Sequence, residues 1–270
     1  MIDYGTAWKE QFDKRSIKGN PYQDDYETAR SYDSSKRIWE DGYRRAAELN
    51  LPKESSVLDI GSGPGVLALP LAGLVHSVTA LEPSSHMISF MKKHIREAAL
   101  ENISIVQSDW ESVDLEKIGS HDIVIASYSL AMRDISRALI KMNRVAKKEV
   151  VLYWFAGIPT WEKLKLELFP LVYKKNFVPG PKSDYIYGAL SRLGISPKVE
   201  PLKDTSFKHS FANREQAVSN VRNKMGVADD KFDGLFQEYV ESKFVKTANS
   251  WVFDDRTDYV KISWQPIGDL

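Results

Sequence analysis

The segment Val57–Gly65, with the sequence VLDIGSGPG, places the strongest limit on how this chain can fold. An apolar run leads into glycines at positions 61, 63 and 65, and a helical pattern follows. Glycine tolerates positive φ and lets a ligand come close to the backbone. In open α/β sheets, ligands bind at the carboxyl ends of the strands. The segment therefore predicts a buried strand, a ligand-binding turn and a helix, in that order.

The sequence around this segment also alternates between strand and helix patterns. From about residue 51 to about residue 157, short apolar runs alternate with helical patterns, which is typical of βαβ units and a mainly parallel sheet. The predicted strands cover residues 56–60, 77–82, 103–107, 122–127 and 149–155. The predicted helices cover residues 35–49 and 64–74, and two more begin after Ser84 and Ser85 and after Asp134.

The pattern changes after residue 157. Helical spacing predicts helices near residues 161–172, 184–193, 213–225 and 232–244, a strand over 198–211 and a closing hairpin over 250–264. We therefore expect four parts. They are an N-terminal helical lid at 1–50, a binding core at 51–157, a cap helix insertion at 158–182, and the rest of the sheet at 183–270 with a helical insertion at about 212–245.

Composition excludes several classes of protein. Hydrophobic residues make up 43% and charged residues 27%, as in ordinary globular proteins, and no apolar run approaches the roughly 20 residues of a membrane span. The first 16 residues have no apolar stretch of the signal-peptide kind, so we expect a cytoplasmic protein. Without cysteine there is no thiolate metal site, and the five histidines lack metal-ligand spacing, so no metal is predicted.

Acidic residues near the glycines indicate what the turn binds. The spacing is G-x-G-x-G, whereas a dinucleotide fingerprint needs G-x-G-x-x-G. Asp59 stands two residues before the first glycine, where it would repel a pyrophosphate but attract a cationic amino group. Glu82 ends the next strand, where a carboxylate can accept hydrogen bonds from ribose hydroxyls. The pattern predicts an adenosine-type ligand with a positively charged end.

Two later strand ends carry further polar and aromatic residues. Asp109 and Trp110 follow the third predicted strand, where a carboxylate can accept a hydrogen bond from an adenine amino group and an indole can stack on the ring. Asp109 as a helix cap and Trp110 as a core residue are the alternatives. Ser127, Tyr128 and Met132 end or follow the fourth strand and are expected beside the glycine turn.

Together these motifs resemble the class I S-adenosylmethionine-dependent methyltransferases, and in particular the small-molecule branch that includes the ubiquinone and menaquinone biosynthesis enzymes. The resemblance covers about residues 55–157. It implies a Rossmann-like, mostly parallel α/β sheet of seven strands with an antiparallel last strand, here with helical cap insertions. The cofactor would be S-adenosylmethionine, and its product S-adenosylhomocysteine.

The resemblance also assigns residues. Asp59, Gly61 and Gly63 would line the methionine end, Glu82 would hold the ribose, Asp109 and Trp110 would flank adenine, and Ser127 and Tyr128 would border the methyl donor. Ser62, Gly65, Pro83 and Met87 complete the predicted cofactor contacts. Members of the branch close an N-terminal helix over the cofactor. The segment Ala29–Asp33 resembles that helix, with Tyr32 as a cofactor contact or, alternatively, a packing residue.

The sequence does not identify the methyl acceptor, the methylated atom, a general base or the oligomeric state. We expect a small-molecule acceptor, with Tyr128, His209 and Trp154 as candidate catalytic residues. Lys plus Arg equals Asp plus Glu at 37 each, which disfavours nucleic acid as a partner. Two alternatives stay open: a methyltransferase acting on RNA or protein, and a non-catalytic protein that binds S-adenosylmethionine.

Overall fold

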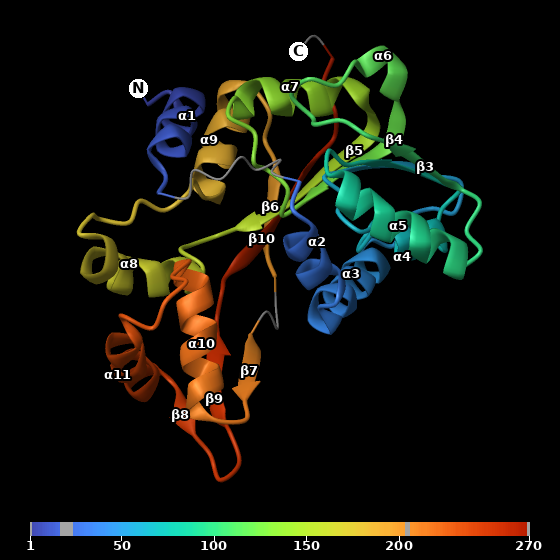
Figure 1. The fold of residues 1–270 in the computed structure, drawn as a ribbon. Helices are drawn as coiled ribbons and strands as arrows, with labels where there is room; N and C mark the ends of the chain where they lie inside the picture. Colours follow the sequence, from blue (N-terminus) through green and yellow to red (C-terminus); the bar gives the residue numbers. More distant parts are fainter. Residues whose placement is uncertain (1, 17–23, 203–205, 269–270) are drawn as a thin grey trace.

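The computed structural model describes residues 2–16, 24–202 and 206–268. A seven-stranded sheet forms the centre, with strand order β3-β2-β1-β4-β5-β10-β6 and helices on both faces. A second sheet of three strands, in the order β7-β9-β8, lies beyond the end of the first at which β9 leads into β10 (Figure 1). The molecule therefore has a Rossmann-like core and a smaller cap.

The central sheet confirms the predicted fold class. Its first five strands pair in parallel, and β10 runs antiparallel to both β5 and β6. The strands are β1 Ser56–Ile60, β2 Ser77–Leu81, β3 Ile103–Val106, β4 His121–Ser127, β5 Ala146–Phe155, β6 Lys198–Pro201 and β10 Tyr259–Trp264. The strand order reverses between β1 and β4, which is where open α/β sheets bind their ligands.

Alternating side chains divide the core into two apolar layers. Val57 belongs to the layer that covers one face and Leu58 to the layer on the other. The first layer is closed by α3 Lys36–Leu49, α4 Ala68–Ala72 and α5 Ser85–Glu97. The second is closed by α1 Tyr4–Lys14, α6 Leu115–Ile118, α7 Ile135–Val145 and α9 Ser183–Arg192. Asp59 shares the parity of Val57, so its side chain lies on the α3 side.

Helix α1 is an addition to the predicted elements. Asp3 caps it by accepting the backbone N–H of Gly5 at 3.1 Å. Trp8 is fully buried, and its indole N–H donates to the carbonyl of Met132 at 2.8 Å. Met132 itself lies in the core. The helix therefore packs on the α7 and α9 side of the sheet. Helix α4 is shorter than the predicted helix over residues 64–74, because the glycine turn continues into it.

Two late predictions are wrong in their pairing. The predicted strand over 198–211 is two strands, β6 and β7 Phe207–Phe211, which belong to different sheets. The predicted closing hairpin is also two separated strands. β9 Trp251–Asp255 pairs with β7 and with β8 Val245–Lys246, whereas β10 pairs with β5 and β6. An alternating pattern identifies a strand, but its partners depend on burial elsewhere in the fold.

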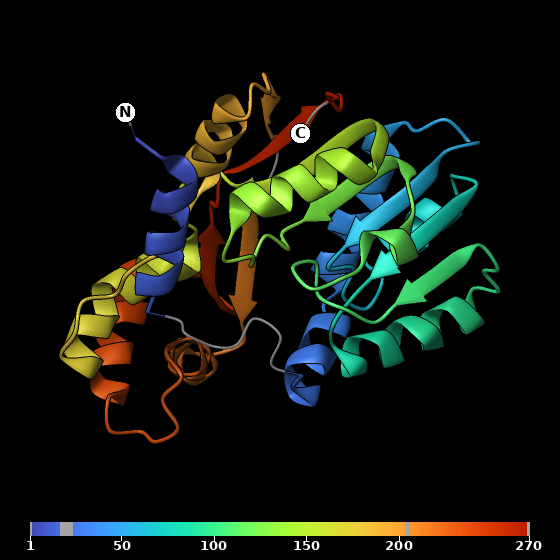
Figure 2. The same cartoon turned by 90° about the horizontal axis from the view of Figure 1, so that it is seen from above.

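The three-stranded sheet and three helices form one unit, which we call the cap. Its helices are α8 Thr160–Tyr173, α10 Arg214–Met225 and α11 Asp233–Lys243. They share an apolar cluster of their own that includes Leu164, Val221 and Phe236. Both views place the cap beside the end of the sheet where β5 runs out (Figure 2). Segments expected as two separate insertions thus pack together.

Candidate cofactor and acceptor site

The glycine turn after β1 is fixed by its neighbours. The backbone N–H of Gly61 donates to the carbonyl of Leu81 at the end of β2, at 2.8 Å. Gly61 has φ +70°, and a Cβ there would lie 2.4 Å from the Cβ of Ser129. A side chain is therefore excluded twice, by conformation and by space. The same contact shows that the turn meets the segment after β4.

Asp59 is a buried carboxyl group beside this turn. Its side chain is 1% exposed, and among the described residues its Oδ2 atom has no hydrogen-bond partner. Burial raises the pKa of Asp59 to about 7, although the positive charge of Arg45 acts in the opposite direction. Buried polar atoms without partners are rare in folded proteins. The carboxyl group therefore fits a ligand that brings a cationic donor, as predicted for the amino group of the methionine moiety.

Glu82 ties the turn to the end of β2. Its carboxylate accepts the backbone N–H of Gly63 and that of Ser84, each at 2.9 Å. Burial raises the pKa of Glu82, and these two hydrogen bonds lower it in part. A carboxylate can accept about four hydrogen bonds. Glu82 can therefore hold the turn and still accept a ribose hydroxyl, which stays a prediction.

Tyr128 marks the end of β4 with an unusual backbone. Its φ is +57°, in the left-handed region that non-glycine residues seldom adopt. Its N–H donates to the carbonyl of Tyr153 at 3.1 Å, which helps to hold this conformation. The ring centroid lies 5.0 Å from that of Tyr259 and 6.0 Å from that of Phe155. Such backbone strain is concentrated at functional sites.

Arg45 on α3 is a site residue that the sequence analysis missed. The side chain is 4% exposed, its Nε lies 3.0 Å from Asp41 Oδ2, and a guanidinium N–H donates to Ser127 Oγ. Its guanidinium carbon also lies 4.8 Å from the ring centroid of Tyr128. The signal was present: Gly42, Arg45, Ala46 and Leu49 follow the i, i+3, i+4, i+7 spacing of a buried helix face.

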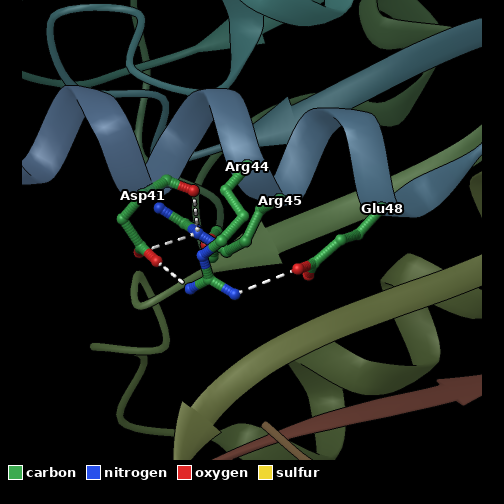
Figure 3. Close-up of polar contacts among 5 residues, drawn as sticks. Asp41, Arg44, Arg45 and Glu48 are labelled. Atoms are coloured by element: carbon green, nitrogen blue, oxygen red, sulfur yellow. Dashed lines mark hydrogen bonds and ion pairs between the residues drawn. The ribbon is translucent and has the colours of Figure 1, made fainter. Parts of the chain in front are cut away.

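The charges around Arg45 form a small network on α3 (Figure 3). Asp41 contacts both Arg44 and Arg45, and Arg44 also donates to Glu48 at 3.1 Å. Arg44 is 37% exposed, whereas Arg45 is buried. Both arginines line the same cleft, but the network leaves Arg45 buried and Arg44 partly exposed to solvent.

Helix α2 Tyr26–Asp33 lies against α5 near the glycine turn. His94 Nε2 lies 2.6 Å from Asp33 Oδ1, and the ring of Tyr26 stacks on Phe90 with centroids 5.9 Å apart. The Tyr32 ring approaches to 4.0 Å from where a Cβ of Gly63 would be. The element that resembled a lid thus lies beside the turn. Contact of Tyr32 with the cofactor stays a prediction.

The remaining predicted residues are more scattered. Asp109 caps the following turn by accepting the Ser112 N–H at 2.9 Å. Trp110 is 2% exposed in the core and donates its indole N–H to the Ala138 carbonyl at 3.1 Å. Their roles beside adenine stay predictions. Met87 follows the Ser84 cap of α5, and its N–H donates to Ser84 Oγ at 3.0 Å.

The three candidate catalytic residues lie in different parts of the structure. Tyr128 lines the site, whereas His209 lies on β7 in the cap, with its Nε2 3.7 Å from Asp255 Oδ2. Trp154, at the end of β5, donates its indole N–H to the Pro181 carbonyl at 3.1 Å. Within the residues described, the structure has no cluster of three or more histidine or acidic side chains suited to a metal ion. No described helix is long and apolar enough to cross a membrane.

A cleft of about 600 Å³ opens beside Tyr128, and we call it the central cleft. It lies between α3, the ends of β5 and β10, and the cap. Its lining includes Tyr32, Arg37, Arg44, Arg45, Tyr128, Phe155, Trp161, Asp255 and Tyr259. Small-molecule sites usually measure about 300–1,000 Å³. The cleft therefore has room for one small molecule next to the strand ends.

The fold and the site agree with the comparison to known families. Residues 57–149 match the family model described as "Methyltransferase domain", which identifies this segment as a methyltransferase domain. The match bears out the predicted methyltransferase domain, whose methyl donor is S-adenosylmethionine. The small-molecule branch stays a prediction.

Relatives of the whole chain are distant. An uncharacterized protein of Haemophilus influenzae is 24% identical over 68% of this chain and 66% of its own length, just under two thirds. A probable ribosomal RNA small subunit methyltransferase A of Thermococcus kodakarensis is 24% identical over 73% of this chain and 75% of its own. The crystal structure of the YcgJ protein of Bacillus subtilis superposes with a TM-score of 0.57 at 16% identity. That alignment covers 87% of this chain and all of the other, and it shows a shared fold.

Proposed function

We propose that this protein transfers a methyl group from S-adenosylmethionine to a small-molecule acceptor bound in the central cleft. The main observation in support of this proposal is the size and position of the central cleft. Its volume of about 600 Å³ suits a single small molecule, and its walls come from α3, the strand ends and the cap. A neutral net charge also argues against binding a nucleic acid backbone.

The chain offers complementary charges to the methionine end of the cofactor. The Oδ2 atom of Asp59, which has no hydrogen-bond partner among the described residues, would accept the ammonium group. The buried guanidinium of Arg45, whose charge acts on Asp59, would meet the carboxylate. Glu82 would accept a ribose hydroxyl beside its two backbone donors. These three side chains come from α3, from β1 and from the residue that follows β2, so only the folded chain assembles them.

We infer that the aromatic residues of the cleft position the acceptor and that neither Tyr128 nor His209 acts as a base. When bound, the cofactor supplies a methyl group on a sulfonium, whose carbon–sulfur bond breaks as the acceptor forms the new bond. Burial raises the pKa of the Tyr128 phenol, which therefore stays protonated at neutral pH. His209 is absent from the lining of the cleft. We infer that the acceptor arrives already nucleophilic, and that Tyr128, Phe155 and Tyr259 align it and exclude water.

The first test is cofactor binding. It is measured by thermal unfolding in the presence of S-adenosylmethionine, S-adenosylhomocysteine or NAD. A ligand that binds only the folded state stabilises it by roughly 2.7 kcal/mol at a hundredfold excess over Kd. We expect stabilisation by the first two ligands and its loss in Asp59→Ala. Stabilisation by NAD alone would overturn the proposal.

The second test identifies the acceptor class. Purified protein with methyl-labelled S-adenosylmethionine is offered separately a small-molecule extract, total RNA and total protein. We expect label only in the small-molecule fraction, and none with an Asp59→Ala control. Label in RNA would favour instead an activity like that named for the Thermococcus relative. Cofactor binding without transfer to any fraction would favour the non-catalytic alternative.

A further inference from the structure

A second cleft, of about 220 Å³, shares Phe155 with the central cleft, and we call it the aromatic cleft. Its rings come from four separate segments: α1, the end of β5, the start of α8 and the segment before α9. They are Phe12, Trp154, Phe155, Trp161 and Phe177. An apolar cavity of about 150 Å³ is large enough to hold benzene. The aromatic cleft therefore has room for a planar ring with a small substituent.

The aromatic cleft adjoins the methyl-transfer site. Phe155 and Trp161 line both clefts. Leu130 and Ala131, which also line the aromatic cleft, follow Tyr128 after the end of β4. A molecule held between these rings would therefore contact the segment that follows the end of β4, next to the place where the methyl donor is expected. This places the aromatic cleft at the acceptor side of the site.

Charged groups in the lining carry a net positive charge. Lys182 Nζ lies 2.7 Å from Glu162 Oε2, and the two side chains are only 13% and 4% exposed. Arg15 stacks on Phe12, with its guanidinium carbon 3.3 Å from the ring centroid. Among the described residues Arg15 donates to the Phe12 carbonyl and forms no ion pair, and Asp13, whose charge acts on it, is not in the lining of the cleft. Arg15, Lys182 and Glu162 therefore sum to one positive charge in the lining.

Lys182 also has donor capacity to spare. Its ammonium group has three N–H donors. In the part of the chain that the structure describes, it contacts Glu162 and donates to the Gly180 carbonyl at 2.6 Å. A third donor thus remains for an oxygen of a molecule in the cleft. A buried ion pair is costly to desolvate, and a site that uses its charge for recognition is one reason to keep it.

We propose that the aromatic cleft binds a planar aromatic anion, and that this is the body of the methyl acceptor. The rings provide flat apolar walls, while Lys182 and Arg15 provide the positive charge for one carboxylate or phenolate. This inference rests on the proposed function, because it assigns a chemical class to the acceptor of the same site.

The test uses the full chain and three probes of similar shape: benzoate, benzyl alcohol and the benzylammonium ion. Binding is followed by calorimetry and by quenching of tryptophan fluorescence, since Trp154 and Trp161 line the cleft. We expect the carboxylate to bind at least tenfold more tightly than the neutral and cationic probes. Equal affinity for all three probes would overturn the proposal.

Two variants with opposite effects sharpen the test. Lys182→Met should remove most of the preference for the anion, whereas Glu162→Gln should increase the anion affinity several-fold, because it removes a competing negative charge and keeps an acceptor for the Gly180 N–H. Lys163→Met, on an exposed side chain of α8, should leave all affinities unchanged. No change in either cleft variant would contradict the inference.

S-adenosylhomocysteine binding is measured on every variant as a check of folding. Normal binding of this product with no anion preference would overturn only the aromatic cleft assignment. If the wild-type chain does not bind S-adenosylhomocysteine, the proposed function is wrong. The three aromatic probes would still test the aromatic cleft in that case.

Discussion

The guanidinium carbon of Arg45 lies 4.8 Å from the ring centroid of Tyr128. This contact joins α3 to the strained residue at the end of β4, in the wall of the central cleft. A buried cation over an aromatic ring gains both electrostatic attraction and apolar contact. The pair therefore fixes a positive charge and a ring next to the glycine turn.

Arg45 should be required for cofactor affinity. Hydrogen bonds to charged groups contribute about 1.5–3 kcal/mol, so Arg45→Met should weaken S-adenosylhomocysteine binding roughly 10- to 100-fold. Calorimetric titration measures this effect. Arg44→Met removes the neighbouring, more exposed cation and should change Kd less than threefold, roughly 0.6 kcal/mol. Similar losses in both variants would contradict the role given to Arg45.

Asp59 should make cofactor binding depend on pH. With its pKa raised to about 7 by burial, about one tenth of the unliganded protein has Asp59 ionised at pH 6 and about nine tenths at pH 8. Binding of an ammonium group needs the ionised form, so affinity should rise about tenfold between these values. Asp59→Asn should bind weakly and without this rise. A flat wild-type profile would be inconsistent with the buried carboxyl as the ammonium ligand.

The same group should lower the stability of the unliganded protein at higher pH. Its pKa is above the unfolded value of about 3.9, so between about pH 4 and 7 the folded state keeps a proton that the unfolded state has lost. Stability from this group therefore falls as pH rises through that window and is constant above it. Urea unfolding should show Asp59→Asn gaining stability relative to wild type from pH 5 to pH 8.

Tyr128 should act through its ring and not its hydroxyl. Because burial raises the pKa of this phenol, Tyr128→Phe should retain kcat/KM within about threefold and keep the shape of the pH profile. Tyr128→Ala removes the wall beside Tyr259 and Phe155 and should lower kcat/KM at least tenfold, or about 1.4 kcal/mol. A loss in Tyr128→Phe equal to that in Tyr128→Ala would instead indicate proton transfer by the hydroxyl.

Trp110 should be a large contributor to stability. It is 2% exposed, and truncating such a ring to alanine usually costs about 3–5 kcal/mol. Urea denaturation of Trp110→Ala should show a loss of this size. The milder Trp110→Phe keeps an aromatic ring. Weaker S-adenosylhomocysteine binding by that variant, with folding intact, would support the predicted contact with adenine.

Local sequence was sufficient for the core of the fold. The bounds of β1 and of α3 were predicted to within one residue, because alternating or helical apolar spacing is set by which face is buried. The turn at Gly61 was recognisable for the same local reason, since its backbone conformation and close packing need glycine.

The late strands show where local sequence is insufficient. The runs that became β9 and β10 look like the two arms of a hairpin, yet they pair with β7 and β5 in separate sheets. Pairing depends on which distant segments are adjacent once the two cores form, and no local pattern contains that information.

What the sequence by itself determined is the framework in which the cofactor site is predicted: a strand, three glycines and two acidic residues at fixed positions along one βαβ unit. What only the tertiary structure decided is the other half. Arg45 comes to Tyr128 because α3 packs on the face that Asp59 shares, and Phe155 meets Trp161 because the cap packs beside the strand ends. Recognition of the acceptor needs side chains from distant segments, and burial in the folded state brings them together.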